Sequence, residues 1–202
     1  MSTVKSKKLQ VGTDASASNN FTIYQPATPD GTLRIGVGNA DNPTEVGRFT
    51  SAGYKPTTAP LFRASMSATQ NVSPSTWTKI QLDVIDFDTN SNFDNTTNYR
   101  FTPTVAGYYQ VNGTMLASCS SSINFAFIAI YKNSQRYVGG YIGLPSVTNT
   151  ALGVTKSDIY YMNGTTDYLE LYGYVNGGGT NRVLASASEN YPSFSAHLIQ
   201  QA

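Results

Sequence analysis

Hydrophobic and polar residues alternate along most of this chain with the period of two that is typical of β-strands. The clearest example begins at residue 109, where Tyr109, Val111 and Met115 fall on one face and polar residues on the other. The same alternation occurs in three further segments, 80–84, 168–175 and 194–198. No stretch of about 11 residues shows a helical period. The pattern therefore predicts an all-β protein.

One segment, Phe125–Tyr131, is apolar on both faces. Such a run predicts a central strand or a strand that is covered on both sides. Glycine and asparagine turn signals separate the strands from residue 57 to the end of the chain. Several short strands between turns of this kind favour a β-sandwich. We therefore expect residues 57–202 to form one sandwich domain.

Residues 1–56 differ in composition, because they are rich in Gly, Asn, Asp, Thr and Pro and contain few large apolar side chains. Three short alternating segments predict strands at Phe21–Tyr24, Leu33–Val37 and Val46–Phe49. So few short strands have little core of their own, and we expect them to become ordered by pairing with copies of themselves or with a larger assembly. The prolines of Lys55–Pro60 predict an extended linker.

The composition narrows the classes of function. Charged residues make up 12% of the chain, and its formal net charge is +1. Binding to nucleic acid needs clustered basic side chains that release counterions, so we expect no nucleic-acid partner. The one basic cluster, Lys5, Lys7 and Lys8, is interpreted as a solvated or assembly-tethered terminus.

Two further observations concern the compartment. No run approaches the roughly 18 apolar residues of a membrane span, so we expect no membrane insertion. No signal-peptide pattern is visible, so we expect the chain to be synthesised in a cytoplasm. The one cysteine, Cys119, is expected to be a small buried thiol without a disulfide partner.

The residue types that could carry catalysis are sparse. His197 is the only histidine, no Gly-x-Ser-x-Gly motif accompanies it, and we interpret it as a surface or interface residue. Four acids, Asp83, Asp86, Asp88 and Asp94, could serve glycoside hydrolysis or hold Ca²⁺. The other ligands of a calcium loop are missing, so solvated loop acids are the preferred interpretation. We expect no catalytic residue, no bound metal and no cofactor, with Ca²⁺ as the one ion that this spacing suits.

Two glycine-containing segments, 139–146 and 176–182, are predicted to be exposed loops, the second of which would join the last two strands. Loops rich in Tyr, Asn and Ser make adaptable contact surfaces, although they could also be plain connectors. The candidate receptor-contact residues are Tyr137, Tyr141, Asn181 and Arg182.

The second half of the chain contains a recognisable motif. Phe101, Gly107 and Tyr109 have the spacing Phe-x5-Gly-x-Tyr, which resembles the signature of the complement globular-head family. Three further elements resemble that family and occur in its order: Ile130–Asn133, Asp167–Leu171 and Phe194–Ile199. Thr166 and Ala196 stand where the family often has glycine, which affects the expected loop geometry.

This resemblance covers about residues 61–200. It implies a ten-stranded jelly roll of the complement and tumour-necrosis-factor kind, assembled as a homotrimer. Some family members bind calcium. The aromatic residues expected in the core or at the subunit seam are Tyr109, Tyr172 and Phe194.

The N-terminal segment resembles the short modules of bacteriophage fibre proteins, through Asp30–Ala40 followed by Phe49–Gly53. We therefore expect a homotrimeric virion appendage, a fibre or spike. Residues 1–56 would contact other virion proteins, and the head would recognise a saccharide or protein of the host surface. The alternatives are a structural capsid or tail decoration protein, a secreted cytokine-like pattern-recognition protein, and a glycan-cleaving enzyme.

Overall fold

The chain consists of two compact units, Met1–Ala59 (unit 1) and Pro60–Ala202 (unit 2). The computed structural model describes residues 7–57, 59–148, 150–186 and 191–202. No helix in these ranges is long and apolar enough to cross a lipid bilayer.

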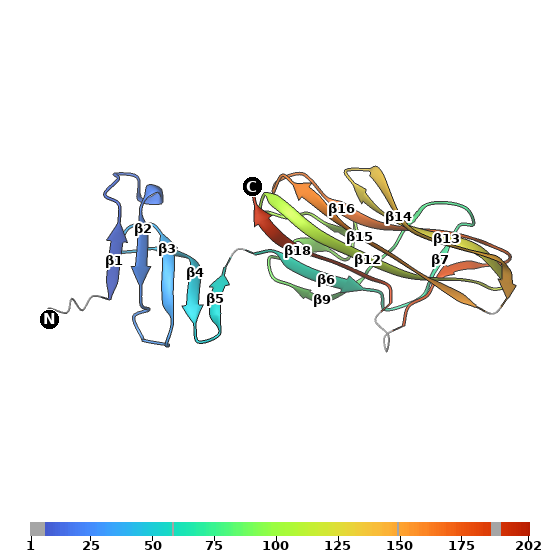
Figure 1. The fold of residues 1–202 in the computed structure, drawn as a ribbon, viewed down its shortest axis with the longest axis horizontal. Coiled ribbons are helices and arrows are strands. Elements are labelled where there is room, and N and C mark those ends of the chain that lie inside the picture. The colour runs from blue at the N-terminus through green and yellow to red at the C-terminus, as the bar shows by residue number, and fades with distance from the viewer. Residues whose placement is uncertain (1–6, 58, 149, 187–190) are drawn as a thin grey trace. The chain divides into compact units, whose positions relative to one another are not determined.

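Unit 1 is an antiparallel sheet whose five strands follow one another in chain order (Figure 1). A short 3-10 helix, η1 (Ala17–Asn19), precedes the second strand. The strands are β1 (Lys8–Val11), β2 (Phe21–Tyr24), β3 (Leu33–Val37), β4 (Thr44–Thr50) and β5 (Gly53–Pro56). The first and last of these were not expected from the sequence. In particular, Lys55 and Pro56 belong to β5 and pair with β4, so they are not part of a linker.

One face of this sheet is apolar and uncovered. The register places Leu9 beside Ile23 and Leu33 beside Phe49, so the apolar side chains of neighbouring strands share a face. Seven of them are between 36% and 60% exposed and define the apolar face of unit 1: Leu9, Val11, Phe21, Ile23, Leu33, Phe49 and Tyr54. A sheet normally buries such a face against a second layer.

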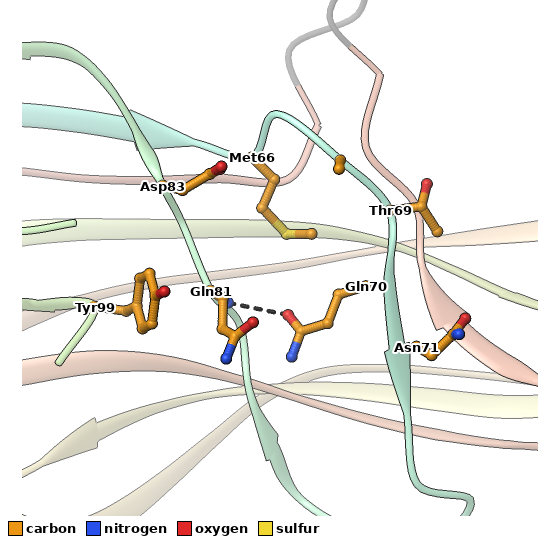
Figure 2. Close-up of a pocket in the computed structure, with 8 residues that line it drawn as sticks. Met66, Thr69, Gln70, Asn71, Gln81, Asp83 and Tyr99 are labelled. Atoms are coloured by element: carbon orange, nitrogen blue, oxygen red, sulfur yellow. Dashed lines mark hydrogen bonds between the residues drawn. The ribbon is translucent and has the colours of Figure 1, made fainter. Parts of the chain in front are cut away.

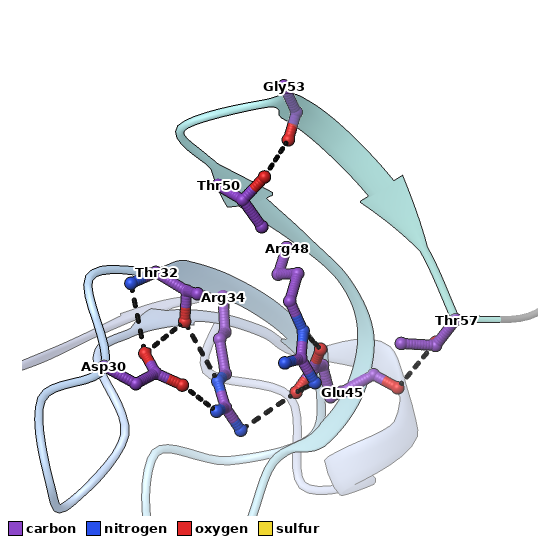
Figure 3. A network of polar contacts seen from close by, with 8 residues as sticks. All are labelled: Asp30, Thr32, Arg34, Glu45, Arg48, Thr50, Gly53 and Thr57. Carbon is purple, nitrogen blue, oxygen red and sulfur yellow. Dashed lines mark hydrogen bonds and ion pairs between the residues drawn. The ribbon is translucent and has the colours of Figure 1, made fainter.

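The opposite face of unit 1 carries an ionic network (Figure 3). The Arg34 guanidinium lies 2.6 Å from the Asp30 carboxylate and 3.1 Å from that of Glu45, and Arg48 binds the same Glu45 at 2.6 Å. Hydrogen bonds from Thr32 and Arg34 lower the pKa of Asp30 to about 2. This face is therefore suited to water, and the sheet is amphipathic.

Unit 2 is a sandwich of two antiparallel sheets. The β12 sheet has the order β7-β17-β12-β18-β6-β9, with β15 paired to the other edge of β12. The β13 sheet has the order β10-β11-β16-β13-β14, with β8 also paired to β16. Figure 1 shows β18, β6 and β9 side by side in one layer. The strands are β6 (Leu61–Ser65), β7 (Gln70–Val72), β8 (Thr78–Lys79), β9 (Val84–Asp88), β10 (Phe93–Asp94), β11 (Arg100–Phe101), β12 (Gly107–Cys119), β13 (Ser122–Lys132), β14 (Gln135–Thr148), β15 (Ala151–Met162), β16 (Leu169–Gly177), β17 (Asn181–Val183) and β18 (Ser193–Gln201).

The expected all-β jelly-roll class is confirmed. The described part of unit 2 contains thirteen strands instead of ten, because five of them are segments of only two or three residues. Residues 80–83 lie between two strands, although Ile80 and Leu82 are fully buried. The Leu82 N–H donates to the Ile80 carbonyl, which turns the chain locally and interrupts the predicted strand.

The core lies between the two sheets. The predicted alternation in β12 is confirmed, with Tyr109, Val111 and Met115 fully buried. They face buried aliphatic residues of the other sheet, including Ile128 and Leu171. Aromatic rings fill one part of this core, where the Phe62 ring stacks on Phe101 at 4.4 Å and meets Phe194 edge-on at 5.3 Å.

The two segments predicted as loops are placed differently. Residues 139–146 lie inside β14. A Cβ at Gly140 would overlap the Thr155 carbonyl oxygen of β15, so this glycine permits a close approach of two strands. Residues 178–180 join β16 to β17 and do not connect the last two strands.

Candidate functional site

The Phe-Gly-Tyr motif is structural. The Tyr109 hydroxyl donates a hydrogen bond to the Val105 carbonyl at 2.8 Å, and its ring meets Phe101 edge-on at 5.7 Å. Burial raises the pKa of Tyr109 to about 12. At Gly107 a Cβ would overlap the Gln200 carbonyl of β18, which explains why the motif has glycine there.

The family-like element Ile130–Asn133 ends in the turn between β13 and β14. Asn133 and Ser134 have φ values of +50° and +67°, as in the two-residue hairpin turns that favour asparagine. The Asn133 side chain donates to the Asp167 carboxylate at 2.6 Å and accepts from the Tyr168 N–H at 2.9 Å. Lys132 lies 3.0 Å from the same carboxylate. This motif therefore ties a hairpin to the start of β16 and is also structural.

The four receptor-contact candidates do not lie together. Asn181 is only 1% exposed, accepts a hydrogen bond from the Cys119 thiol and donates to the Gly179 carbonyl, so its side chain is unavailable to a receptor. Arg182 is half-buried on β17. Tyr137 and Tyr141 are both on β14, where Tyr137 contacts the Tyr160 ring and Tyr141 contacts Phe127.

The three candidates for core or seam aromatics are divided between two regions. Tyr109 and Phe194 are fully buried in the core. Tyr172 lies on the outer face of the β13 sheet, stacked on Tyr131 at 3.9 Å. None of the three lies on the outer face of the β12 sheet.

The acids of residues 83–94 are used locally. Asp86 pairs with Arg63, and Asp88 accepts from the Phe93 N–H at 2.8 Å. Backbone N–H groups of Thr97 and Thr96 lower the pKa of Asp94. Across the described ranges, no three His, Cys, Asp or Glu side chains are placed to hold a metal ion. His197 is exposed on β18. Lys8 donates to the Ala40 carbonyl at 2.5 Å, and Lys5 lies outside the described residues.

A shallow depression of about 380 Å³ lies beside β7 (Figure 2). Its lining is mainly polar, and Gln70 occupies it by accepting from the Gln81 N–H at 3.0 Å and donating to the Lys79 carbonyl at 2.9 Å. Burial alone would raise the pKa of Asp83 at its rim, but hydrogen bonds from Ser67 outweigh burial and lower it. Gln70 and Asp83 already have hydrogen-bond partners within the protein, and we assign no ligand site to this depression.

The outer face of the β12 sheet is apolar. Register pairs place Tyr108 opposite Tyr161 and His197 opposite Leu61, with their side chains directed away from the core. Six large apolar side chains on this face are between 39% and 54% exposed: Leu61, Phe87, Tyr108, Ile159, Tyr161 and Ile199. We call these residues the apolar face of the β12 sheet.

The outer face of the β13 sheet is aromatic. Phe125, Phe127 and Tyr131 of β13 alternate with the buried Ala126, Ile128 and Ile130, so the doubly apolar strand has one aliphatic and one aromatic face. Seven rings form a continuous cluster, the aromatic platform: Trp77, Phe125, Phe127, Tyr131, Tyr141, Tyr172 and Tyr174. The alternation of aromatic and aliphatic residues in β13 was the available sequence signal for this cluster.

Comparison with known proteins bears on the fold. Neither protein-family models nor curated proteins match this sequence. The zebrafish complement 1qA globular domain is 14% identical, with a TM-score of 0.51 over 71% of this chain and 98% of that one. The Eiger tumour necrosis factor of S. frugiperda is 13% identical (TM-score 0.48, covering 71% and 93%), and murine APRIL is 7% identical (TM-score 0.48, covering 70% and 99%). The chain therefore contains a jelly roll with the fold of the complement globular domain.

Proposed function

We propose that this chain is a non-enzymatic recognition protein whose unit 2 assembles as a homotrimer through the apolar face of the β12 sheet. The observation that carries this proposal is the gathering of six large, exposed apolar side chains on one sheet face. Monomeric proteins rarely expose a patch of this kind. The threefold arrangement is what the resemblance to complement globular heads implies.

The polar groups on the same face support its burial in a subunit seam. Gln110 and Asn112 both hydrogen-bond to Ser157 at 2.8 Å, and Thr114 hydrogen-bonds to Ser193 at 2.8 Å. These side chains are uncharged and satisfy one another, and the charged Arg63 and Asp86 on the same face pair with each other beside the edge strand β9. Protein interfaces are depleted of charge at their centre, so this composition fits a seam.

We expect the protein to sediment at three times its subunit mass of 21.8 kDa at micromolar concentration. Ile159, which is 54% exposed on the apolar face, supplies the test. Ile159→Lys places a charge in the seam, and burying an unpaired charge is costly, so the variant should sediment as a monomer. Analytical ultracentrifugation of the full chain and of residues 60–202 measures this.

Val138→Lys is the matched control, because Val138 is a similarly exposed β-branched residue of the other sheet. This variant should remain a trimer. A monomeric parent would contradict the proposal, and an Ile159→Lys variant that stays trimeric would show that the seam is elsewhere.

Unit 1 is proposed to be the attachment segment of a virion appendage that is made in the host cytoplasm. Its apolar face is uncovered, and a sheet of short strands with one open apolar face is marginal alone. The ionic network of Asp30, Arg34 and Glu45 suits the other face to solvent. Copies of unit 1 within the trimer, or neighbouring virion proteins, would cover the apolar face.

Deleting residues 1–59 should leave unit 2 folded and able to associate, because the core of unit 2 is its own. Isolated residues 1–59 should show no cooperative melting, or melting whose midpoint rises with protein concentration, since the apolar face must find a partner. Circular dichroism across a hundredfold concentration range measures this. A cooperative transition that is independent of concentration would identify unit 1 as an autonomous domain.

A further inference from the structure

We propose that the aromatic platform on the outer face of the β13 sheet is a saccharide-binding surface. This inference rests on the proposed recognition function and assigns its ligand class and its site. The platform replaces the loop site expected from the sequence, because Tyr141 belongs to it and Arg182 does not.

The rings form one continuous surface built by four separate segments. Trp77, which precedes β8, lies 5.4 Å from the Tyr174 ring of β16 and 6.2 Å from Phe127 of β13. Phe127 lies 4.6 Å from Tyr141 of β14. Aromatic faces carry negative charge density, which attracts the polarised C–H groups on the flat side of a pyranose ring. The platform therefore offers several adjacent stacking positions.

The rings of the platform pack on one another and on the sheet beneath them. Ala129 beneath it is fully buried, and the Tyr131 and Tyr172 rings stack at 3.9 Å. Burial raises the pKa of Tyr172 to about 12, so its hydroxyl keeps its proton over the physiological range. A surface fixed in this way loses little conformational freedom on binding.

Hydrogen-bonding groups lie at the border of the rings. The Asn124 amide donates to the Asn176 side chain at 2.8 Å, and Asn176 donates to the Ser75 hydroxyl at 2.6 Å. The Arg136 guanidinium lies 5.1 Å from the centre of the Trp77 ring. In the described part of the chain it forms no salt bridge, which leaves its donors available to sugar hydroxyl or carboxylate oxygens.

The exposure of the platform side chains, compared with that of the apolar face of the β12 sheet, favours a saccharide over a second protein chain as the ligand of the platform. On the platform only Tyr141 is strongly exposed, at 61%, while the other six rings are half-buried against one another. A protein partner would remove little new apolar area from water there, and buried apolar area is its main source of affinity. A sugar needs only ring faces with donors beside them. The apolar face of the β12 sheet has the opposite character, with exposed aliphatic side chains.

The chain supplies its own reporter, because Trp77 is its only tryptophan. We would screen the full-length protein on an array of bacterial and animal glycans and then titrate the best-bound glycan while recording tryptophan fluorescence. The platform variants are Tyr141→Ala and Arg136→Ala. Tyr137→Ala and Arg182→Ala are matched controls of the same residue types off the platform.

The parent should bind at least one glycan with a saturable change in Trp77 emission. Both platform variants should weaken binding by about tenfold or more, and both controls should bind like the parent. A parent that binds no glycan, platform variants that bind normally, or capture of a protein instead of a glycan would overturn the inference. Ultracentrifugation of the same samples separates the proposals, because a trimer that binds no glycan contradicts only the saccharide site.

Discussion

Tyr109→Ala is expected to lower the free energy of unfolding of unit 2 by about 3 to 5 kcal/mol, as for other large buried aromatic residues. The side chain is fully buried, packs on Phe101, and donates a hydrogen bond to the Val105 carbonyl. Its removal leaves a cavity and an unpaired carbonyl together. Urea unfolding of the parent and the variant measures the difference.

Two further substitutions show how much of this loss of stability comes from the hydroxyl and how much from the burial of the ring. Tyr109→Phe keeps the ring and loses the hydroxyl, so it should cost only about 1 kcal/mol. Tyr141→Ala removes the same side chain where it is 61% exposed and should cost less than about 1 kcal/mol. An unchanged midpoint for Tyr109→Ala would mean that the strand faces in β12 are assigned the wrong way round.

Asp167→Ala is expected to cost about 2 to 3 kcal/mol at neutral pH, because it leaves Lys132 and Asn133 without their shared acceptor. Burial alone would raise the pKa of Asp167, but hydrogen bonds from Asn133 and Lys132 outweigh burial and lower it. The stabilisation is therefore complete above about pH 4, the range of an unfolded aspartate, and is lost as the pH falls through the lower folded pKa.

The measurement is urea unfolding of parent and variant at pH 7 and at pH 2.5. The difference in free energy of unfolding should be large at pH 7 and should shrink at pH 2.5. Asp158→Ala is the control, since Asp158 pairs with Lys156 but its side chain is 48% exposed, and exposed pairs contribute less than about 1 kcal/mol. If both variants lost the same free energy of unfolding at pH 7, the contacts of Asp167 would contribute no more than an exposed surface ion pair.

The sequence was sufficient where one face of a strand is buried and the other is polar. The alternation around Tyr109 and Val111 in β12 placed the correct residues in the core, because a period of two assigns the buried face directly. The apolar face of the β12 sheet was harder to predict. Exposed Tyr108 and buried Tyr109 are adjacent and chemically alike, and only the neighbouring strands show that Tyr108 shares its face with Tyr161.

The predictions for Gly140 and Asn181 were wrong for a different reason. The glycine at position 140 predicts a loop, but it lies in β14, whose backbone approaches that of β15. Asn181 has the composition of a contact residue, yet the carbonyls of Gly177 and Gly179 need its amide donors. Both roles depend on contacts with residues that are distant in the sequence or that no sequence pattern indicates. The local sequence therefore could not predict them.

The two sheets of unit 2 lie back to back, and this arrangement determines the valence of the proposed assembly. If the outer face of the β12 sheet is turned toward a threefold axis, the outer face of the β13 sheet must point away from it. Three platforms would then diverge around the circumference instead of lying in one plane. A flat layer of short glycans would meet one platform at a time, whereas a long polymer that wraps around the assembly could occupy two or three. The gain from multivalency should therefore grow with the chain length of the polysaccharide.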